Sequence, residues 1–194
     1  MKKNHIEAFY AKTPEEAVII FKDLVRENSV VTAGGCMTSI ELGIVEILRS
    51  GVYNYIDRER PGITPEEVQV VQRQAFTADY FITGTNAITE KGELFNIDGN
   101  GNRVAAISYG PKEVIVIAGS NKIVRDAEEA RKRVKEISAP ANAMRLDCNT
   151  PCTIDGICRN CASEKRICCT EVLTGYQRIK NRIKVIIVDG DFGF

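Results

Sequence analysis

Residues 78–122 decide the fold of this chain and have the sequence ADYFITGTNAITEKGELFNIDGNGNRVAAISYGPKEVIVIAGSNK. Apolar runs at 81–82, 94–97 and 114–117 can be buried in a sheet, whereas the Thr, Asn, Asp and Gly residues that follow each run cannot serve as core. Polar residues at strand ends suggest a ligand site. Ordinary turns are the alternative explanation, because Gly, Asn and Asp also dominate turns.

Strands and helices alternate on both sides of this stretch. Thr13 with Glu16 three places later predicts the start of an amphipathic helix over 14–27. The other predicted helices cover 38–48, 66–75 and 124–137, and the other predicted strands cover 29–33, 53–56 and 184–189. This order predicts an α/β fold with a mostly parallel sheet flanked by helices, in which ligands bind beyond the carboxyl ends of the strands.

The size and charge of the chain limit its organisation and its partners. Its 194 residues, 44% of them hydrophobic, suffice for a single domain over 1–194, with 1–28 as an N-terminal helical segment. Lys plus Arg and Asp plus Glu number 26 each, so no global field attracts nucleic acid or membrane. Because no apolar run resembles a signal peptide or a membrane span, we expect a cytoplasmic protein.

A glycine turn follows the strand predicted at 29–33. Gly34 and Gly35 are followed by Cys36 and the hydroxyl residues Thr38 and Ser39, at the start of a helical pattern. Backbone N–H groups of such a turn can hold a phosphate or a carboxylate, and the two hydroxyl groups can add donors. A glycine pair before a helix can equally serve only to make a tight turn. The polar loop over 57–64 is a second segment that could border a site.

Familiar catalytic motifs are missing from the sequence. The segment 98–102 fails the dinucleotide fingerprint, because the third glycine of that motif would fall at Val104, and the chain has no Walker A sequence. His5 is the only histidine, which argues against a catalytic triad. A general base would therefore be a carboxylate beside the glycine turns, and Glu41, Glu90 and Asp98 are the candidates, with a solvated surface position as the alternative for Glu90. Arg103 or Lys122 could supply the positive charge for an anionic ligand.

Six of the seven cysteines lie in a cysteine-rich segment, 147–170. Cys158 and Cys161 form a C-x2-C pair, with Cys152 before it and Cys168 or Cys169 after it. Four thiolates could bind zinc or an iron-sulfur cluster, and the single pair does not identify the metal. Free or redox-active thiols and structural disulfides remain the alternatives. Basic residues in the same segment could lower thiol pKa values or pair with an anion.

The residues resemble the LUD domain family of lactate-utilization proteins in several motifs. These are Gly34 to Thr38 (GGCMT) with Glu41 and Gly43, the runs TGTNAITE at 83–90 and GELFNIDG at 92–99, Gly101-Asn102-Arg103, Gly110-Pro111, Gly119, Asn121, Lys122, Ala139-Pro140, Pro151-Cys152, Cys158, Cys161 and Arg166-Ile167-Cys168. The motifs cover most of the chain from Val31 onward. One departure is Cys36, where the family often has serine.

The resemblance implies a NagB/RpiA/CoA transferase-like fold with a site made by loops at strand ends. The ligand-binding residues would be Gly34, Gly35, Cys36, Thr38, Ser39, Thr85, Asn86, Asn96, Gly99, Asn102, Arg103, Asn121 and Lys122. The implied role is binding a small anionic metabolite during oxidation of lactate to pyruvate, with iron-sulfur or oxidoreductase partner proteins, and the fold suggests a homodimer. An isomerase or transferase acting on a phosphorylated or CoA-linked molecule, and a noncatalytic sensor or assembly subunit, remain alternatives.

Overall fold

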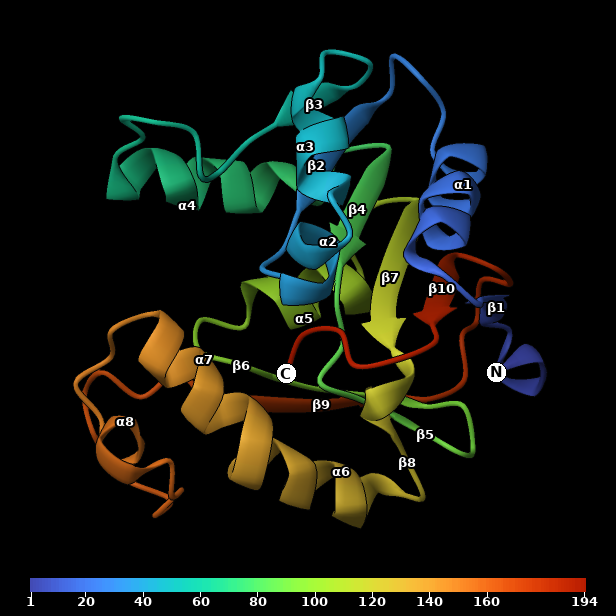
Figure 1. Ribbon diagram of the computed structural model, residues 1–194. Coiled ribbons are helices and arrows are strands. Elements are labelled where there is room, and N and C mark those ends of the chain that lie inside the picture. The colour runs from blue at the N-terminus through green and yellow to red at the C-terminus, as the bar shows by residue number, and fades with distance from the viewer.

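A computed structural model describes residues 1–194 and contains two sheets with helices packed around them (Figure 1). The larger sheet has six strands in the order β1-β10-β7-β4-β2-β3, and every neighbouring pair is parallel. Its strands are β1 (Glu7–Ala11), β2 (Val30–Ala33), β3 (Asn54–Ile56), β4 (Tyr80–Thr83), β7 (Glu113–Gly119) and β10 (Ile183–Val188). The predicted α/β fold with a mostly parallel sheet is confirmed.

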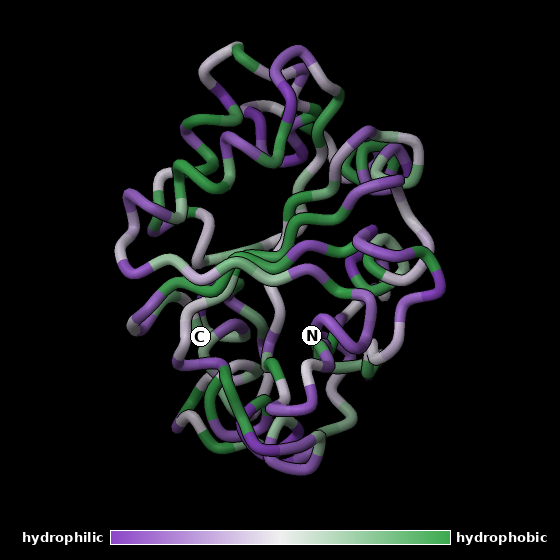
Figure 2. The backbone as a smooth tube through the Cα atoms, turned by 90° about the vertical axis from the view of Figure 1, so that its right-hand side faces the viewer, coloured by the Kyte–Doolittle hydropathy of each residue, from purple (hydrophilic) through white to green (hydrophobic).

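Both faces of the larger sheet are buried, because helices cover each of them. Phe21, Leu48 and Ile117 belong to the core on one face, and Phe81, Ile107 and Val116 belong to the core on the other. The strands consequently form a continuous hydrophobic band through the centre of the molecule (Figure 2). The helices of this part are η1 (Lys2–Asn4), α1 (Pro14–Leu24), α2 (Met37–Glu41), α3 (Ile44–Arg49), α4 (Pro65–Gln74) and α5 (Asn102–Ser108).

The smaller sheet lies beyond the carboxyl ends of the parallel strands (Figure 1). Its four strands, in the order β8-β5-β6-β9, are β5 (Ala87–Thr89), β6 (Leu94–Asp98), β8 (Ile123–Val124) and β9 (Thr170–Thr174). Phe95 and Val124 from this sheet pack with Ala130 and Val134 from the helices over it. Those helical segments are η2 (Ser120–Lys122), α6 (Ala127–Arg133), the π-helical η3 (Val134–Ser138) and α7 (Ala139–Arg145). The apolar run at 94–97 is therefore a strand, but in the second sheet.

The N-terminal segment differs from the prediction, since 1–28 is not wholly helical. Glu7–Ala11 forms β1, which pairs in parallel with β10 at the edge of the larger sheet. Thr13 caps α1 as predicted, because its hydroxyl oxygen accepts from Glu16 N at 3.3 Å. The helix predicted over 38–48 is divided into α2 and α3 by Gly43, whose φ of 68° is left-handed and interrupts the helical path.

The cysteine-rich segment is tied into the structure at both of its ends. It follows α7 and leads into β9, which pairs with β6. Between these two elements the only regular structure is α8 (Cys152–Asp155). One edge of the smaller sheet thus depends on a strand that comes after the cysteines.

None of the helices has both the length and the apolar composition that a membrane span needs. The α-helix α1 has 11 residues and α4 has 10, against the roughly 20 apolar residues that cross a bilayer.

Candidate functional site

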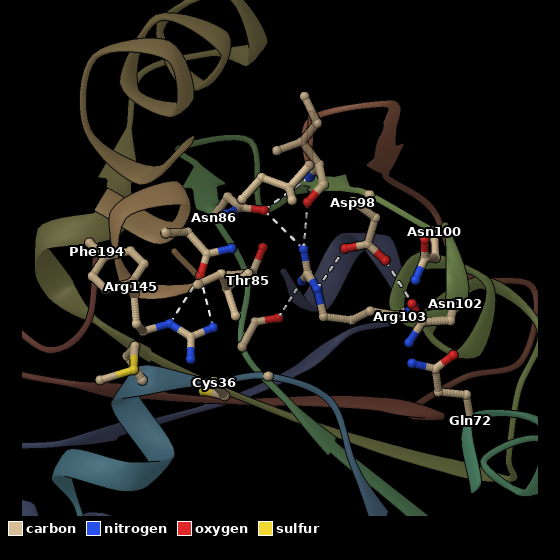
Figure 3. A pocket seen from close by; sticks show the side chains of 18 of the residues that line it. Cys36, Gln72, Thr85, Asn86, Asp98, Asn100, Asn102, Arg103, Arg145 and Phe194 are labelled. Atoms are coloured by element: carbon tan, nitrogen blue, oxygen red, sulfur yellow. Dashed lines mark hydrogen bonds and ion pairs between the residues drawn. The ribbon is translucent and has the colours of Figure 1, made fainter. Parts of the chain in front are cut away.

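A cleft of about 340 Å³ lies between the carboxyl ends of the parallel strands and the smaller sheet (Figure 3). The turns after β2 and β4 contribute Cys36 and Asn86, and the segment that joins β6 to α5 contributes Asp98 and Arg103. The cysteine-rich segment contributes Arg166. The cleft therefore occupies the strand-end position in which open α/β sheets bind ligands, as the sequence predicts.

Glycines allow the turns after β2 and β4 to approach each other closely. A Cβ atom on Gly84 would lie 2.8 Å from Cys36 Sγ, and one on Gly34 would lie 3.0 Å from both Phe81 Cζ and Thr83 Oγ1. Gly34 N also donates to Ile82 O at 2.8 Å. Gly34 thus serves the tight turn and does not line the cleft, whereas the next residues, Gly35 and Cys36, line it.

Cys36 is both the first capping residue of α2 and part of the cleft wall. Its sulfur accepts a hydrogen bond from Ser39 N at 3.4 Å, and its thiol donates to Ile117 O at 3.7 Å. Sulfur is a weak acceptor, so this cap is weaker than the serine cap that the position could carry. These two contacts hold the Cys36 side chain in place, and it still lines the cleft.

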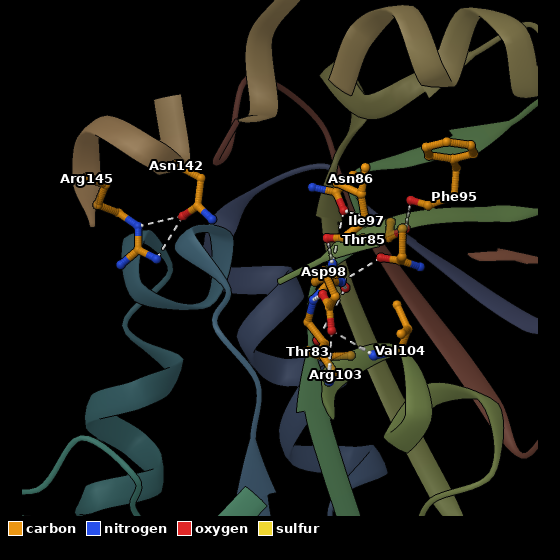
Figure 4. Close-up of polar contacts among 12 residues, drawn as sticks. Thr83, Thr85, Asn86, Phe95, Ile97, Asp98, Arg103, Val104, Asn142 and Arg145 are labelled. Atoms are coloured by element: carbon orange, nitrogen blue, oxygen red, sulfur yellow. Dashed lines mark hydrogen bonds and ion pairs between the residues drawn. The ribbon is translucent and has the colours of Figure 1, made fainter. Parts of the chain in front are cut away.

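Arg103 is the centre of the polar network that forms the inner wall (Figure 4). Its Nε donates to Asp98 Oδ1 at 2.9 Å, and the other four N–H groups have protein acceptors as well. Those acceptors are Gly84 O at 3.0 Å, Asn96 Oδ1 at 2.6 Å, Asn86 Oδ1 at 3.0 Å and Ile97 O at 3.0 Å. Because a guanidinium has five N–H donors, Arg103 has none left for a ligand.

Asp98 joins this network to the beginning of α5. Its Oδ2 accepts from the backbone N–H groups of Arg103 at 2.9 Å and Val104 at 3.0 Å, while Oδ1 accepts from the Arg103 side chain. A carboxylate at a helix N-terminus satisfies amide groups that otherwise have no partner. Asp98 and Arg103 therefore fix the wall, and the acid-base role predicted for Asp98 would compete with these three hydrogen bonds.

Lys122 is the cation in the cleft that the protein leaves largely unpaired. The residue is 4% exposed, and its Nζ donates to Thr38 Oγ1 at 3.2 Å without forming an ion pair. Burial lowers the pKa of Lys122, while the charge of Cys36 acts in the opposite direction. A buried ammonium group with one neutral acceptor has donors and charge available for an anion.

Three arginines extend the positive charge around the cleft. Arg58, Arg145 and Arg166 also line it, whereas Asp98 is the one acidic side chain of the lining. Arg145 lies across the cleft from the Arg103 network and donates to Asn142 Oδ1 at 3.1 and 2.9 Å (Figure 4). Since Asp98 is paired with Arg103, the cleft has an excess of cations, and this favours a negatively charged ligand.

Several predicted site residues surround the cleft without lining it. Glu41 Oε2 accepts from Gly193 N at 2.7 Å, and Asn121 Nδ2 donates to Gly193 O at 3.2 Å, so both hold the C-terminal residues. The Thr38 hydroxyl donates to Phe192 O at 3.0 Å. The lining residues among those predicted are Gly35, Cys36, Thr85, Asn86, Asp98, Gly99, Asn102, Arg103 and Lys122, and those behind them are Gly34, Thr38, Ser39, Glu41, Asn96 and Asn121.

Other lining residues escaped the sequence prediction. Gln72, Asn142, Arg145 and Phe194 come from α4, from α7 and from the chain after β10. No motif marks these residues, since they reach the cleft only through tertiary packing. The position of Arg58 could be anticipated from the sequence, because Arg58 belongs to the polar loop 57–64 that we expected to border a site.

The cysteine-rich segment forms the outer wall of the cleft through Arg166 and Ile167, and four of its cysteines line a separate small cavity of about 20 Å³ beside these residues. They are the predicted metal ligands, Cys152, Cys158, Cys161 and Cys168, and all seven cysteines of the chain are unbonded to one another. Burial raises the pKa of Cys168. No group of three or more His, Cys, Asp or Glu side chains is arranged around a common point as a metal centre.

The fold and the cleft together define an α/β protein with a cation-lined site beyond the carboxyl ends of its parallel strands. The chain belongs to the LUD domain family, which its sequence matches over residues 1–188. It is accordingly a lactate-utilization-type domain protein. The resemblance seen in its motifs is thereby confirmed.

Similar solved structures include that of a DUF162 family protein from Deinococcus radiodurans. It is 18% identical with a TM-score of 0.52, and the match covers 97% of this chain and 91% of that chain, a likeness of fold. The eIF2B beta structure from Chaetomium thermophilum has a TM-score of 0.43 and 13% identity, over 60% of this chain and 44% of that one. No curated protein matches the sequence.

Proposed function

We propose that this protein binds a small anionic metabolite in the cleft and contributes to the oxidation of lactate to pyruvate together with partner proteins. Membership of the LUD domain family supports the pathway. The excess of cations in the cleft supports the anionic ligand, because lactate and pyruvate are both carboxylates.

The observation that carries the proposal is the position of Lys122. Burying an ammonium group without a counter-ion is costly, and an anion in the cleft would remove that cost. Thr38 fixes the position of Nζ, and the network of Arg103 fixes the inner wall of the cleft. A carboxylate that reaches Lys122 would form charge-assisted hydrogen bonds in a site that folding has already arranged.

Oxidation of lactate to pyruvate transfers a hydride equivalent from carbon and releases the hydroxyl proton, so the reaction needs an electron acceptor. The proposal assigns that acceptor to an iron-sulfur or oxidoreductase partner protein. The contribution of this chain is then to bind the carboxylate and to orient the substrate or product beside Cys36 and Lys122.

The volume of the cleft favours a second candidate ligand. About 340 Å³ is more space than a molecule the size of lactate requires, and it lies within the range of roughly 300–1,000 Å³ that larger ligands occupy. Arg58 and Arg145 could meet a second anionic group. A phosphorylated or CoA-linked small molecule would use both ends of the cleft, which corresponds to an isomerase or a transferase.

Calorimetric titration with lactate, pyruvate, inorganic phosphate, a sugar phosphate and coenzyme A tests both candidates. We expect Lys122→Met to weaken binding of the anion by about 10- to 100-fold, the equivalent of a lost charge-assisted hydrogen bond. Lys112→Met is the matched control, because Lys112 is exposed and outside the cleft. Binding of lactate or pyruvate supports the first candidate and binding of phosphates alone supports the second. If none binds, or if both variants bind equally, the proposal is wrong.

A further inference from the structure

Arg133 is a buried cation that the proposed function does not use. The residue is 8% exposed, it does not line the cleft, and no carboxylate pairs with it. Its three hydrogen bonds go instead to neutral oxygens of Asn86, Asn121 and Ser138. Burying a guanidinium group without a counter-ion is costly, and these bonds are what offsets that cost.

Two of the three acceptors are backbone carbonyls just before neighbouring strands of the smaller sheet. β5 and β8 are parallel, with Ile88 opposite Ile123, and both lie next to α6 (Figure 1). Asn86 and Asn121 each come two residues before this pair. Arg133 Nη1 donates to Asn86 O at 2.9 Å, and Nε donates to Asn121 O at 3.3 Å. One guanidinium group thus joins the two segments that lead from the larger sheet into the smaller one.

The third acceptor depends on the π-helical turn η3, which follows α6 directly. Arg133 Nη1 donates to Ser138 Oγ at 2.9 Å, five residues further along the chain. Residues five apart in an α-helix lie about 140° from each other around the axis, whereas the i→i+5 bonding of a π-turn brings them to one face. The π-turn therefore lets the buried Ser138 hydroxyl orient the guanidinium group toward the two carbonyls.

The side chain of Asn86 has its amide nitrogen free for a ligand. Its Oδ1 accepts from Arg103 Nη2 at 3.0 Å and from Ile97 N at 2.9 Å (Figure 3). Both partners can only donate, so the oxygen faces them and the orientation of the carboxamide is fixed. Nδ2 has no acceptor in the protein, and Asn86 lines the cleft. Asn86 therefore offers N–H donors to a ligand oxygen.

The charge of Arg133 also acts on Lys122, the residue that follows Asn121. Burial lowers the pKa of Lys122 most, Cys36 raises it, and the charge of Arg133 lowers it again. The two cations are thus close enough for Arg133 to add positive potential where Lys122 faces the cleft. An anion at Lys122 would be attracted by both charges.

We propose that Arg133 is a positioning residue that holds Asn86 and Lys122 as a pair of donors for one carboxylate or phosphate group. It bonds to the backbone of Asn86 itself and to that of Asn121, the neighbour of Lys122. The anion would receive a neutral hydrogen bond from Asn86 Nδ2 and a charge-assisted one from Lys122 Nζ. This inference rests on the proposed function, because it specifies which groups hold the anion in the cleft.

Calorimetric titration with pyruvate and with inorganic phosphate tests the role of Arg133. We expect Arg133→Met to weaken anion binding by about 10-fold, the equivalent of one lost hydrogen bond. Lys132→Met is the matched control and should bind as wild type does, since Lys132 is exposed on the same helix and outside the cleft. Equal affinities of the two variants would overturn the inference and leave the proposed anion site intact. If wild type binds neither anion, the proposed function is wrong and the donor pair with it.

A heteronuclear NMR spectrum separates positioning from a general loss of stability. The side-chain amide signal of Asn86, identified by its absence in Asn86→Ser, should move when the anion is added to wild type. The signal of Asn54, which donates to Asn28 O outside the cleft, should stay in place. Ser138→Ala covers an Arg133→Met protein that fails to fold, and it should displace the Asn86 signal before any anion is added and weaken binding. An Asn86 signal that does not respond to a bound anion, or full affinity in Ser138→Ala, would overturn the inference.

Discussion

The two walls of the cleft are held in different ways. On the inner wall, Asn96 is fully buried and the Arg103 network satisfies every donor of the guanidinium. On the outer wall, which the cysteine-rich segment provides through Arg166 and Ile167, residues 151–169 have no buried side chain. The inner wall is therefore arranged by folding itself, whereas the outer wall can change with little cost to the rest of the molecule. Changes to stability and changes to ligand binding should thus come from different residues.

The largest effect should come from the centre of the inner wall. Arg103→Met removes five hydrogen bonds and leaves the Asp98 carboxylate, which is 7% exposed, without its ion pair. Breaking a buried ion pair from one side costs about 3–5 kcal/mol. We expect a loss of that size in the free energy of unfolding, measured with urea.

Arg145→Met is the control on the opposite side of the same cleft. Arg145 is exposed and bonds only to Asn142, so the free energy of unfolding should change by no more than about 0.5 kcal/mol. Equal losses of unfolding free energy in Arg103→Met and Arg145→Met would contradict the inference that the inner wall contributes more to stability than the opposite side of the cleft.

The next effect tests how tightly the inner wall is packed. Gly84→Ala puts a methyl group 2.8 Å from Cys36 Sγ, and overpacking of this kind costs about 1–3 kcal/mol. Cys36→Ala in the same chain removes the sulfur and should recover most of the loss in thermal or urea unfolding. Losses that simply add in the double variant would show that the strain comes from the backbone, since Ile117 O is also within 3.5 Å of the added Cβ.

Much of the inner wall could be predicted from the sequence. The run 114–117 is apolar at every position because both faces of β7 are buried. Polar residues at 85–86, 98–103 and 122 follow strands, and strands that run parallel bring such residues to one edge of the sheet. This reasoning brought Asn86 and Lys122 together correctly, whereas Asp98 reaches the same cleft from β6, an antiparallel strand of the smaller sheet.

The rest depends on contacts between distant parts of the chain. β1 has five residues and acquires its identity only by pairing with β10, at the other end of the sequence. The pairing of β6 with β9 also joins distant parts of the chain, so within the second sheet only the pairing of β5 with β6 is local in sequence. The sequence predicts that Arg103 is a cation at the site, but only the folded structure shows that its five donors are already used.

The pH dependence of stability tests the burial of Lys122 in the cleft. The pKa of Lys122 is lowered from 10.5 by burial, so between the lowered pKa and 10.5 the unfolded chain holds a proton that the native chain has lost. Native stability contributed by this group therefore rises with pH through that window. Lys122→Met should remove the rise, whereas Lys112→Met should keep it, in urea unfolding from neutral pH upward. A rise that persists in Lys122→Met would assign it to another group.

The smallest effect is expected on the outer wall, where Ile154 is 86% exposed. Ile154→Ala should change the free energy of unfolding by no more than about 0.5 kcal/mol, because the side chain is exposed to water in both the folded and the unfolded protein. The same substitution at Ile88, which is 3% exposed in the smaller sheet, should cost about 2–5 kcal/mol. Because substitutions of exposed residues usually change stability by no more than about 0.5 kcal/mol, a loss above about 1 kcal/mol for Ile154→Ala would mean that Ile154 is covered in solution. The outer wall would then pack against another surface. Measuring stability at decreasing protein concentrations would show whether a second copy of the chain provides that surface, because stability that depends on association decreases on dilution.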